Sequence, residues 1–338
     1  MMQLRKWLFF LNIVLFVFSG FCADYYTADF MRIGVGARPL AMGSAFTAIA
    51  DDAGSFYWNP GGMVSAKRFS LQVEHVPVFD GLAQYNSAAL VVGLGEQLAL
   101  GISWIRLGVD DIPRYGPLQG TRFDRMTQAQ YRSTGEAEGV FTDTEDALMI
   151  SIAHRRYYDL YFGSSVDPIV IPLEVSFGLN GKYIHQKLDQ SSGSGQGLDA
   201  GFLLRFTSLK HKKNEPLTWI GIGAMFRDIS RTSIIWDTES GHKDRINRQI
   251  QAGVAFSHLI SLFRTRLTLS ADKEFGFYSA LHAGAEARFF HLLALRAGFY
   301  REEPTFGAGF SLGGVTIDYA FISHDLSNTH RISGAFWF

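Results

Sequence analysis

The sequence predicts an all-β protein, a transmembrane antiparallel β-barrel of about fourteen strands. Three observations lead to this prediction. Segments of the second half alternate between an apolar row and a row of Gly, polar and charged residues. No stretch beyond the N-terminus reaches the roughly 18 apolar residues of a spanning helix. The chain ends in an alternating segment that closes on Phe336-Trp337-Phe338. Because lipid leaves only helices or closed barrels as spanning structures, these observations favour the barrel.

The N-terminus has the pattern of a secretory signal peptide. Arg5 and Lys6 precede an apolar run from Trp7 to Phe18, and small residues follow. We predict a signal peptide at residues 1–22, removed just after Cys22, the only cysteine. Lipid attachment at Cys22 is the alternative, although a bulky Phe21 precedes it. Cleavage would leave a chain without a thiol, and so without a disulfide or a Cys-based metal site.

Composition and motifs argue against several classes of function. The net charge of -1 gives no basic excess for phosphates, so no nucleic-acid partner is expected. The ten histidines lack a metal-ligand spacing. Ser311 lies in a Gly-x-Ser-x-Gly match, but within a predicted strand and with no helix after it, which a nucleophile elbow requires. We therefore predict no catalytic residue, no metal and no cofactor, and hence no enzyme.

The alternation indicates which rows face lipid. From residue 247 onward, Gln249, Gln251 and Gly253 share one face, and Val254 and Phe256 lie on the other. A soluble sandwich would carry more Lys, Glu and Thr on its outer rows. Here the polar rows are rich in Gly, Ala and Ser, which suits a curved and filled interior. A soluble periplasmic β protein is the alternative to a barrel in lipid.

The barrel is predicted for residues 67–338. The expected strands are 68–76, 84–94, 97–106, 146–156, 173–187, 197–207, 217–228, 247–257, 266–272, 281–289, 293–300, 306–313, 315–321 and 330–338. The gaps 107–145 and 229–245 are long, whereas the gaps at 95–96, 291–292 and 313–314 are tight. Long outer loops and short periplasmic turns are expected of such a barrel. The gaps 157–172 and 208–216 do not fit this rule.

Residues 34–63 do not alternate. Small residues dominate, and a short helix is possible from Ser44 to Ala50. This composition suits a compact element packed inside another structure.

Three motifs in this segment carry a resemblance to a known family. They are residues 36–43 (Gly-Ala-Arg-Pro-Leu-Ala-Met-Gly), 50–53 (Ala-Asp-Asp-Ala) and 57–60 (Tyr-Trp-Asn-Pro). Together they resemble the N-terminal hatch of FadL-like outer-membrane proteins, with most similarity to the PorV/PorQ branch and to an uncharacterised spirochaetal branch. The resemblance implies a hatch at residues 23–66 inside a fourteen-stranded barrel, in the outer membrane of a Gram-negative-type envelope. The family's Asn-Pro-Ala is Asn59-Pro60-Gly61 here, which puts a contact of the alanine methyl group in doubt.

The resemblance also implies roles for individual residues. Asn59 and Pro60, followed by Gly61, would shape a turn of the hatch. Arg38, Asp51 and Asp52 would tie the hatch to the wall. Buried charges need partners, so we expect wall charges to point inward, namely Asp272, Glu286, Arg288, Arg296 and Asp318. Structural pairing without contact to a ligand is the simpler interpretation of all these residues.

The resemblance suggests binding and uptake of hydrophobic small molecules such as long-chain fatty acids. The alternative is a PorV-like accessory of protein secretion, whose partners would be secretion components and cargo proteins. A general polar porin is the weakest hypothesis, because a filled lumen conducts poorly. Membrane lipid is an expected partner, and so is the barrel-assembly machinery, which would read the terminal strand ending at Phe338.

Overall fold

The computed structural model describes residues 27–132, 135–163, 168–207, 217–276, 279–323 and 328–338. The predicted signal peptide and Cys22 lie outside the described residues. Within them the chain is almost entirely β-structure, and no helix there is long and apolar enough to cross a membrane.

Fourteen strands form the wall, one for each strand predicted. They are β1 (Phe69–Val78), β2 (Ala83–Leu94), β3 (Leu98–Arg114), β4 (Gly139–Gly163), β5 (Pro168–Leu188), β6 (Ser191–Thr207), β7 (Thr218–Arg227), β10 (Gln249–Ile260), β11 (Thr265–Phe275), β12 (Ala280–Phe289), β13 (Leu293–Tyr300), β14 (Glu303–Leu312), β15 (Val315–Ile322) and β16 (Thr329–Trp337). Two further strands, β8 (Ser233–Trp236) and β9 (Lys243–Arg245), form a hairpin that pairs with the wall only through β6.

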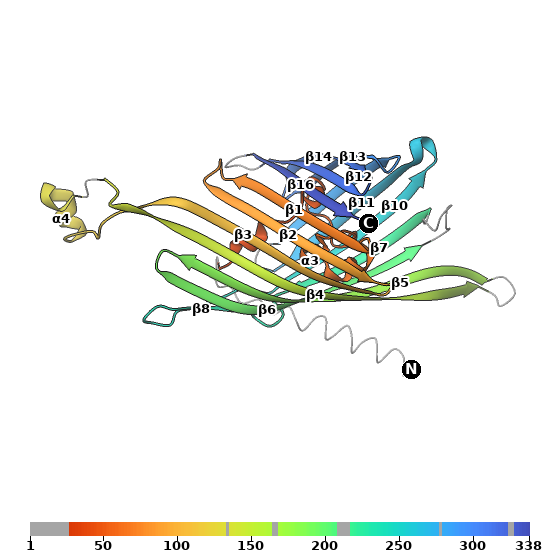
Figure 1. Cartoon of the computed structure of the whole chain (residues 1–338), viewed down its shortest axis with the longest axis horizontal. Helices are drawn as coiled ribbons and strands as arrows, with labels where there is room; N and C mark the ends of the chain where they lie inside the picture. The colour runs from red at the N-terminus through yellow and green to blue at the C-terminus, as the bar shows by residue number, and fades with distance from the viewer. Residues whose placement is uncertain (1–26, 133–134, 164–167, 208–216, 277–278, 324–327) are drawn as a thin grey trace.

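The wall closes on itself, as Figure 1 shows. Neighbouring strands pair antiparallel around the ring, and β5–β6 and β1–β16 complete it. At the β1–β16 seam, Phe69 and Phe338 exchange two backbone hydrogen bonds of 3.1 Å and their rings stack. The prediction of an all-β, antiparallel barrel of about fourteen strands is therefore confirmed.

The two faces of the wall differ as the alternation predicted. In β10, Gln251, Gly253 and Ala255 are buried in the lumen, while Val254 and Phe256 are exposed outside. A ring of strands with an apolar exterior and a filled polar interior is the form of a barrel in the outer membrane. The outer rows of exposed Leu, Ile, Val and Phe are thus the surface for lipid.

The two ends of the barrel also differ. One end has the tight turns between β2 and β3, β12 and β13, and β14 and β15, and we call it the inner, periplasmic end. The other, outer end carries the long loops. The loop expected at 107–145 is shorter than predicted, because β3 extends to Arg114 and β4 begins at Gly139. Its tip holds α4 (Arg122–Thr127) and η3 (Ala129–Tyr131), far from the barrel in Figure 1.

The gap expected at 157–172 is wrong, because most of it is strand. Tyr157 to Gly163 continue β4, Pro168 to Pro172 begin β5, and the two pair with each other. Period-two alternation between polar and apolar rows is lost here because both faces carry apolar residues, which hid the strands. The other anomalous gap, 208–216, lies outside the described residues.

Residues 27–66, which we call the N-terminal segment, lie inside the barrel. The segment contains η1 (Asp29–Arg32), α2 (Ala37–Ala41), α3 (Ser55–Trp58) and η2 (Pro60–Ser65), and most of its side chains are buried. The helix expected from Ser44 to Ala50 is wrong. Gly43 and Ser44 have φ of 62° and 65°, so the chain turns there. The amides of Phe46 and Thr47 then donate to the carboxylate of Asp272 instead of to a helix.

Wall glycines allow the segment to touch the wall with its backbone. A Cβ at Gly298 would overlap the backbone of Met42 and Gly43, and one at Gly223 would overlap that of Thr47. Gly178, Gly221 and Gly284 face the segment's backbone in the same way, and three further wall glycines face its side chains, namely Gly101, Gly201 and Gly307. Glycine at these positions has a steric purpose, because any side chain would push the segment away from the wall.

Candidate functional site

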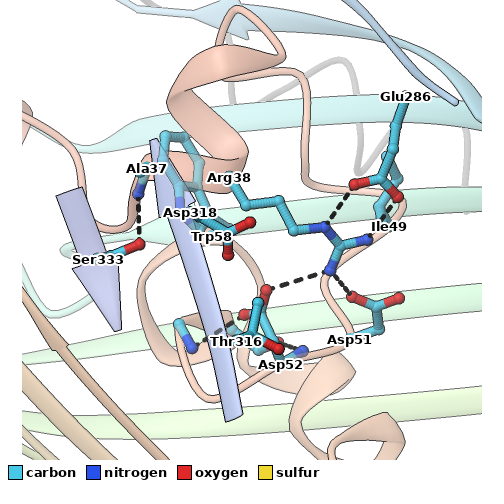
Figure 2. Close-up of polar contacts among 12 residues, drawn as sticks. Ala37, Arg38, Ile49, Asp51, Asp52, Trp58, Glu286, Thr316, Asp318 and Ser333 are labelled. Atoms are coloured by element: carbon cyan, nitrogen blue, oxygen red, sulfur yellow. Dashed lines mark hydrogen bonds and ion pairs between the residues drawn. The ribbon is translucent and has the colours of Figure 1, made fainter. Parts of the chain in front are cut away.

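Most of the predicted charged site residues lie around Arg38, on the side of the N-terminal segment that faces the inner end of the barrel. Its guanidinium donates to both carboxylate oxygens of Glu286 on β12, at 3.0 and 3.2 Å. Nη1 meets Asp51 at 2.5 Å and Asp52 at 3.3 Å. Figure 2 shows Arg38 held between the wall carboxylate and the two aspartates of its own segment. Arg38 thus carries the direct ion pair to the wall, while Asp51 and Asp52 hold Arg38.

The carboxylate of Glu286 accepts hydrogen bonds from three arginines. Besides Arg38, it accepts from Arg296 Nε at 2.7 Å and from Arg288 Nη2 at 3.1 Å. Arg296 also donates to Asp318 on β15 at 2.7 Å. Neighbouring residues on β12, β13 and β15 point into the lumen at the same level, which brings these charges together. Four of the five predicted wall charges are therefore joined in one network.

Burial and neighbouring charge set the ionisation of the segment's carboxyls. Burial raises the pKa of Asp52 to about 6, since Arg38 offsets the desolvation only in part and Asp51 adds repulsion. Burial also acts on Asp51, but its contact with Arg38 outweighs it and lowers the pKa. The network therefore loses negative charge at Asp52 first when the pH falls.

Asp272 and the Asn59 turn lie apart from this network. Asp272 is buried on β11, where Oδ2 accepts the amides of Phe46 and Thr47 at 3.0 and 2.8 Å. The Asn59 side chain caps η2 by accepting from the amide of Gly61, and donates to the carbonyls of Thr47 and Phe202. Pro60 is the first residue of η2. These residues fix the segment's fold and its seat on the wall.

Other buried charges escaped the sequence prediction. Arg331 on β16 donates to the carbonyls of Ile33 and Gly34 and lies 3.6 Å from Glu74. Lys182 on β5 pairs with Asp199 at 2.8 Å and with Asp228 at 2.7 Å. Glu74, Lys182 and Asp199 share the parity of the buried residues in their strands. Their position in the alternating pattern could have predicted that these side chains point inward. The alternation around residues 182 and 199 is too weak for that prediction.

A cavity of about 1120 Å³ lies between the network and the inner end of the barrel. Arg38, Asp51 and Asp52 form part of its lining, as do the inner turns at Glu96 and His291. The remaining charges of the lining are Lys67, Arg155, Asp159, Glu174, Arg205, Arg266, Glu286, Arg288, Arg296 and Asp318. Acidic and basic side chains alternate around it, so the inner half of the lumen is polar.

Part of the outer half of the lumen is apolar, whereas Lys182 and its partners Asp199 and Asp228 make the part beside β5 to β7 charged. On β1 the buried row changes from Ser70, Gln72 and Glu74 at the inner end to Val76 and Val78 at the outer end. The same change runs across neighbouring strands, and we call the buried residues Val76, Val78, Tyr85, Ile105, Met149, Ile184 and Ile322 the outer apolar lining. Phe30 from the N-terminal segment belongs to the same apolar cluster. Two small cavities, of about 60 and 40 Å³, lie between the N-terminal segment and the outer part of the wall.

Within the described ranges no three His, Cys, Asp or Glu side chains are placed to hold a metal ion. Ser311 lies in β14, where its hydroxyl meets that of Thr316 on β15 at 2.9 Å. The absence of enzymatic activity stays a prediction, as do the gating roles of the site residues.

Comparison with known proteins gives distant structural likenesses only. No protein-family model and no curated protein matches the chain. The toluene transporter TodX of P. putida matches with a TM-score of 0.48 and 10% identity, over 90% of this chain and 99% of that one. The monoaromatic hydrocarbon channel CymD matches with 0.42 and 13%, over 90% and 98%. A Pseudomonas aeruginosa FadL homologue matches with 0.41 and 9%, over 94% and 99%.

Proposed function

We propose that the chain binds hydrophobic small molecules at the cell surface and takes them up through the outer membrane. The observation that carries this proposal is the outer apolar lining, which places buried aliphatic side chains where a ligand from outside would enter. Apolar lining with few polar groups is typical of small-molecule sites. The three similar structures are described as a toluene transporter, a hydrocarbon channel and a FadL homologue, which agrees with this ligand class.

One polar group in the outer apolar lining suits a ligand with a head group. Tyr85 is fully buried, and among the described residues its hydroxyl has no hydrogen-bond partner. A buried hydroxyl without a partner carries a desolvation cost that a ligand carboxylate would relieve. We therefore propose a long-chain fatty acid, with a monoaromatic hydrocarbon as the alternative ligand. Entry requires Phe30 and its neighbours to move, because the outer cavities are small.

Titration of the purified barrel with a fluorescent polyene fatty acid tests the proposal. We expect saturable binding by the native chain. The Ile105→Asn variant should bind at least about tenfold more weakly, which corresponds to about 1.4 kcal/mol, because it places an amide in the apolar lining. The matched control is Ile102→Asn on the same strand, since Ile102 is exposed on the lipid face.

The Tyr85→Phe variant separates the two ligand classes. It should weaken binding of the fatty acid and leave binding of toluene unchanged, because only the fatty acid has a carboxylate for the hydroxyl. The absence of saturable binding of either ligand, beside a competent control barrel, would refute the proposal of hydrophobic uptake.

A second candidate function is that of a PorV-like accessory to protein secretion. It is favoured by the tip of the loop between β3 and β4, where Leu118, Phe123 and Met126 are 68%, 72% and 67% exposed. Exposed apolar side chains on a projecting loop are typical of protein-interaction sites. The assignment to the PorV/PorQ branch belongs to this proposal.

Affinity purification from cells that carry such a secretion system tests this candidate. We expect secretion components or cargo to be recovered with the native chain and lost with the Phe123→Ser/Met126→Ser variant. Gln119→Ser, in the same exposed loop, should retain them. Recovery of neither cargo nor secretion components with the native chain would exclude the accessory role.

A further inference from the structure

The hairpin of β4 and β5 extends beyond the inner end of the barrel. β3 begins at Leu98, opposite His154, and the last β5–β6 pair is Leu173 with Phe206. Residues 156–163 and 168–172 lie beyond these limits, and we call them the inner ribbon. Among the described residues they have no strand on either side, and Figure 1 shows the ribbon projecting past the neighbouring strands. At about 3.3 Å per residue, the eight residues of the β4 arm extend roughly 25 Å.

Beyond Arg156, one face of the inner ribbon is apolar. Cross-strand partners share a face, and the pairs Tyr158 with Leu173, Leu160 with Ile171, and Phe162 with Ile169 lie on the same side. Tyr158, Phe162 and Ile169 are 49%, 52% and 65% exposed. The opposite face is mixed, with Tyr157, Asp159 and Tyr161 on its β4 arm.

The apolar face is a direct continuation of the lipid-facing surface of the barrel. On β4 it has the parity of Ile150 and Ile152, and on β5 that of Phe177 and Leu179, all of which are exposed on the outside of the wall. The sheet is continuous between these positions, so the ribbon presents the same side as the membrane belt. Only His154 and Arg156 interrupt the row.

The polar interruption lies where the ribbon leaves the wall, so the ribbon has to run along the headgroup region to keep its apolar face on lipid. Arg156 is exposed on the outer face, where an arginine can reach lipid phosphates while its stem lies along apolar surface. Tyr158 follows on the same face, and tyrosine is enriched at membrane interfaces. In water, by contrast, a two-stranded ribbon has little stability of its own, and charged residues usually protect its edges from other strands.

We propose that the apolar face of the inner ribbon lies against the periplasmic leaflet of the outer membrane, with phospholipid as its occupant. The continuity with the lipid-facing wall favours lipid over a protein partner. Tyr157, Tyr158, Asp159 and Pro172, at the base of the ribbon, also line the inner cavity, so the proposal places the mouth of that cavity at the leaflet surface. This inference does not depend on which ligand or cargo the barrel handles.

Site-directed spin labelling of the full chain tests this inference. Single cysteines replace Leu160 and Phe162 on the apolar face, and Asp159 and Tyr161 on the opposite face, in a Cys22→Ser background. The barrel is placed in nanodiscs of phosphatidylethanolamine and phosphatidylglycerol. Reference labels at Ile150, on the lipid-facing wall, and at Gln119, in the outer loop, define the lipid and water limits. Heat-modifiable migration on gels confirms that each variant is folded.

Labels at 160 and 162 should be more accessible to oxygen than to a water-soluble nickel chelate, as the label at 150 is. Labels at 159 and 161 should show the reverse, as at 119. Nickel-dominated collisions at all four positions would overturn the inference. So would labels at 160 and 162 that are shielded from both agents in native membranes but exposed to nickel in nanodiscs, because that result indicates a protein partner.

Discussion

Replacement of Gly298 by valine should release the N-terminal segment from the wall and open the lumen. A Cβ at this position of β13 overlaps the backbone of Met42 and Gly43, and backbone cannot move aside as a flexible side chain can. Overpacking of this kind costs about 1–3 kcal/mol, and more where the neighbouring atoms are backbone that cannot shift. The strand pairing of β12 to β14 does not involve the side chain of residue 298, so the barrel should still form. Planar-bilayer recordings should then show steady conductance, whereas we expect the native chain to conduct little.

The matched control is Gly181→Val on β5. Nothing lies within 4 Å of a Cβ at Gly181, and its parity places it on the lipid face. This variant should remain closed. Equal conductance of the two variants would show that the glycine contacts do not hold the segment in place.

Replacement of Glu286 by glutamine should produce the largest loss of stability in the segment. It leaves Arg38, Arg288 and Arg296 without the carboxylate that all three contact. Removal of one partner from a buried charge network costs about 3–5 kcal/mol. We expect faster proteolysis within the N-terminal segment of the folded barrel, measured by mass spectrometry of the fragments.

The control for this prediction is Asp146→Asn, which breaks the exposed pair between Arg106 and Asp146 on the outside of the wall. An exposed pair contributes at most about 1 kcal/mol, so proteolysis should not change. A Glu286→Gln/Arg38→Met variant should recover part of the protection, because it removes one of the stranded cations. Protection unchanged by Glu286→Gln alone would contradict the proposed importance of the network.

The wall could be predicted from the sequence because each of its residues has one of two environments. In β10 and β13 the lipid and lumen rows alternate without a break, so the strands were found to within about three residues of their bounds. The inner ribbon could not be predicted in this way, since apolar residues on both faces remove the alternation. The N-terminal segment follows no period either, and its path depends on contacts such as that of Asp272 with residues 46 and 47.

The candidate site could be predicted only in part. Arg38 was expected at the wall from the family resemblance, and Glu286, Arg296 and Asp318 were expected to point inward because buried charges need partners. The sequence did not show which carboxylate pairs with which arginine, because the pairing depends on the register between neighbouring strands. The change from polar to apolar lumen-facing residues along β1, from Ser70 to Val78, was visible in the sequence. Which end of the barrel is polar became clear only from the closed ring of strands.

The seam between β1 and β16 constrains the order in which the barrel can assemble. It joins the first and the last strand of the wall, so the ring cannot close before β16 has reached the membrane. The N-terminal segment precedes β1 in the chain and is packed against wall strands on all sides of the ring, so its final contacts form together with the closure of the barrel. Closure of the ring thus encloses the N-terminal segment against the wall glycines that contact it.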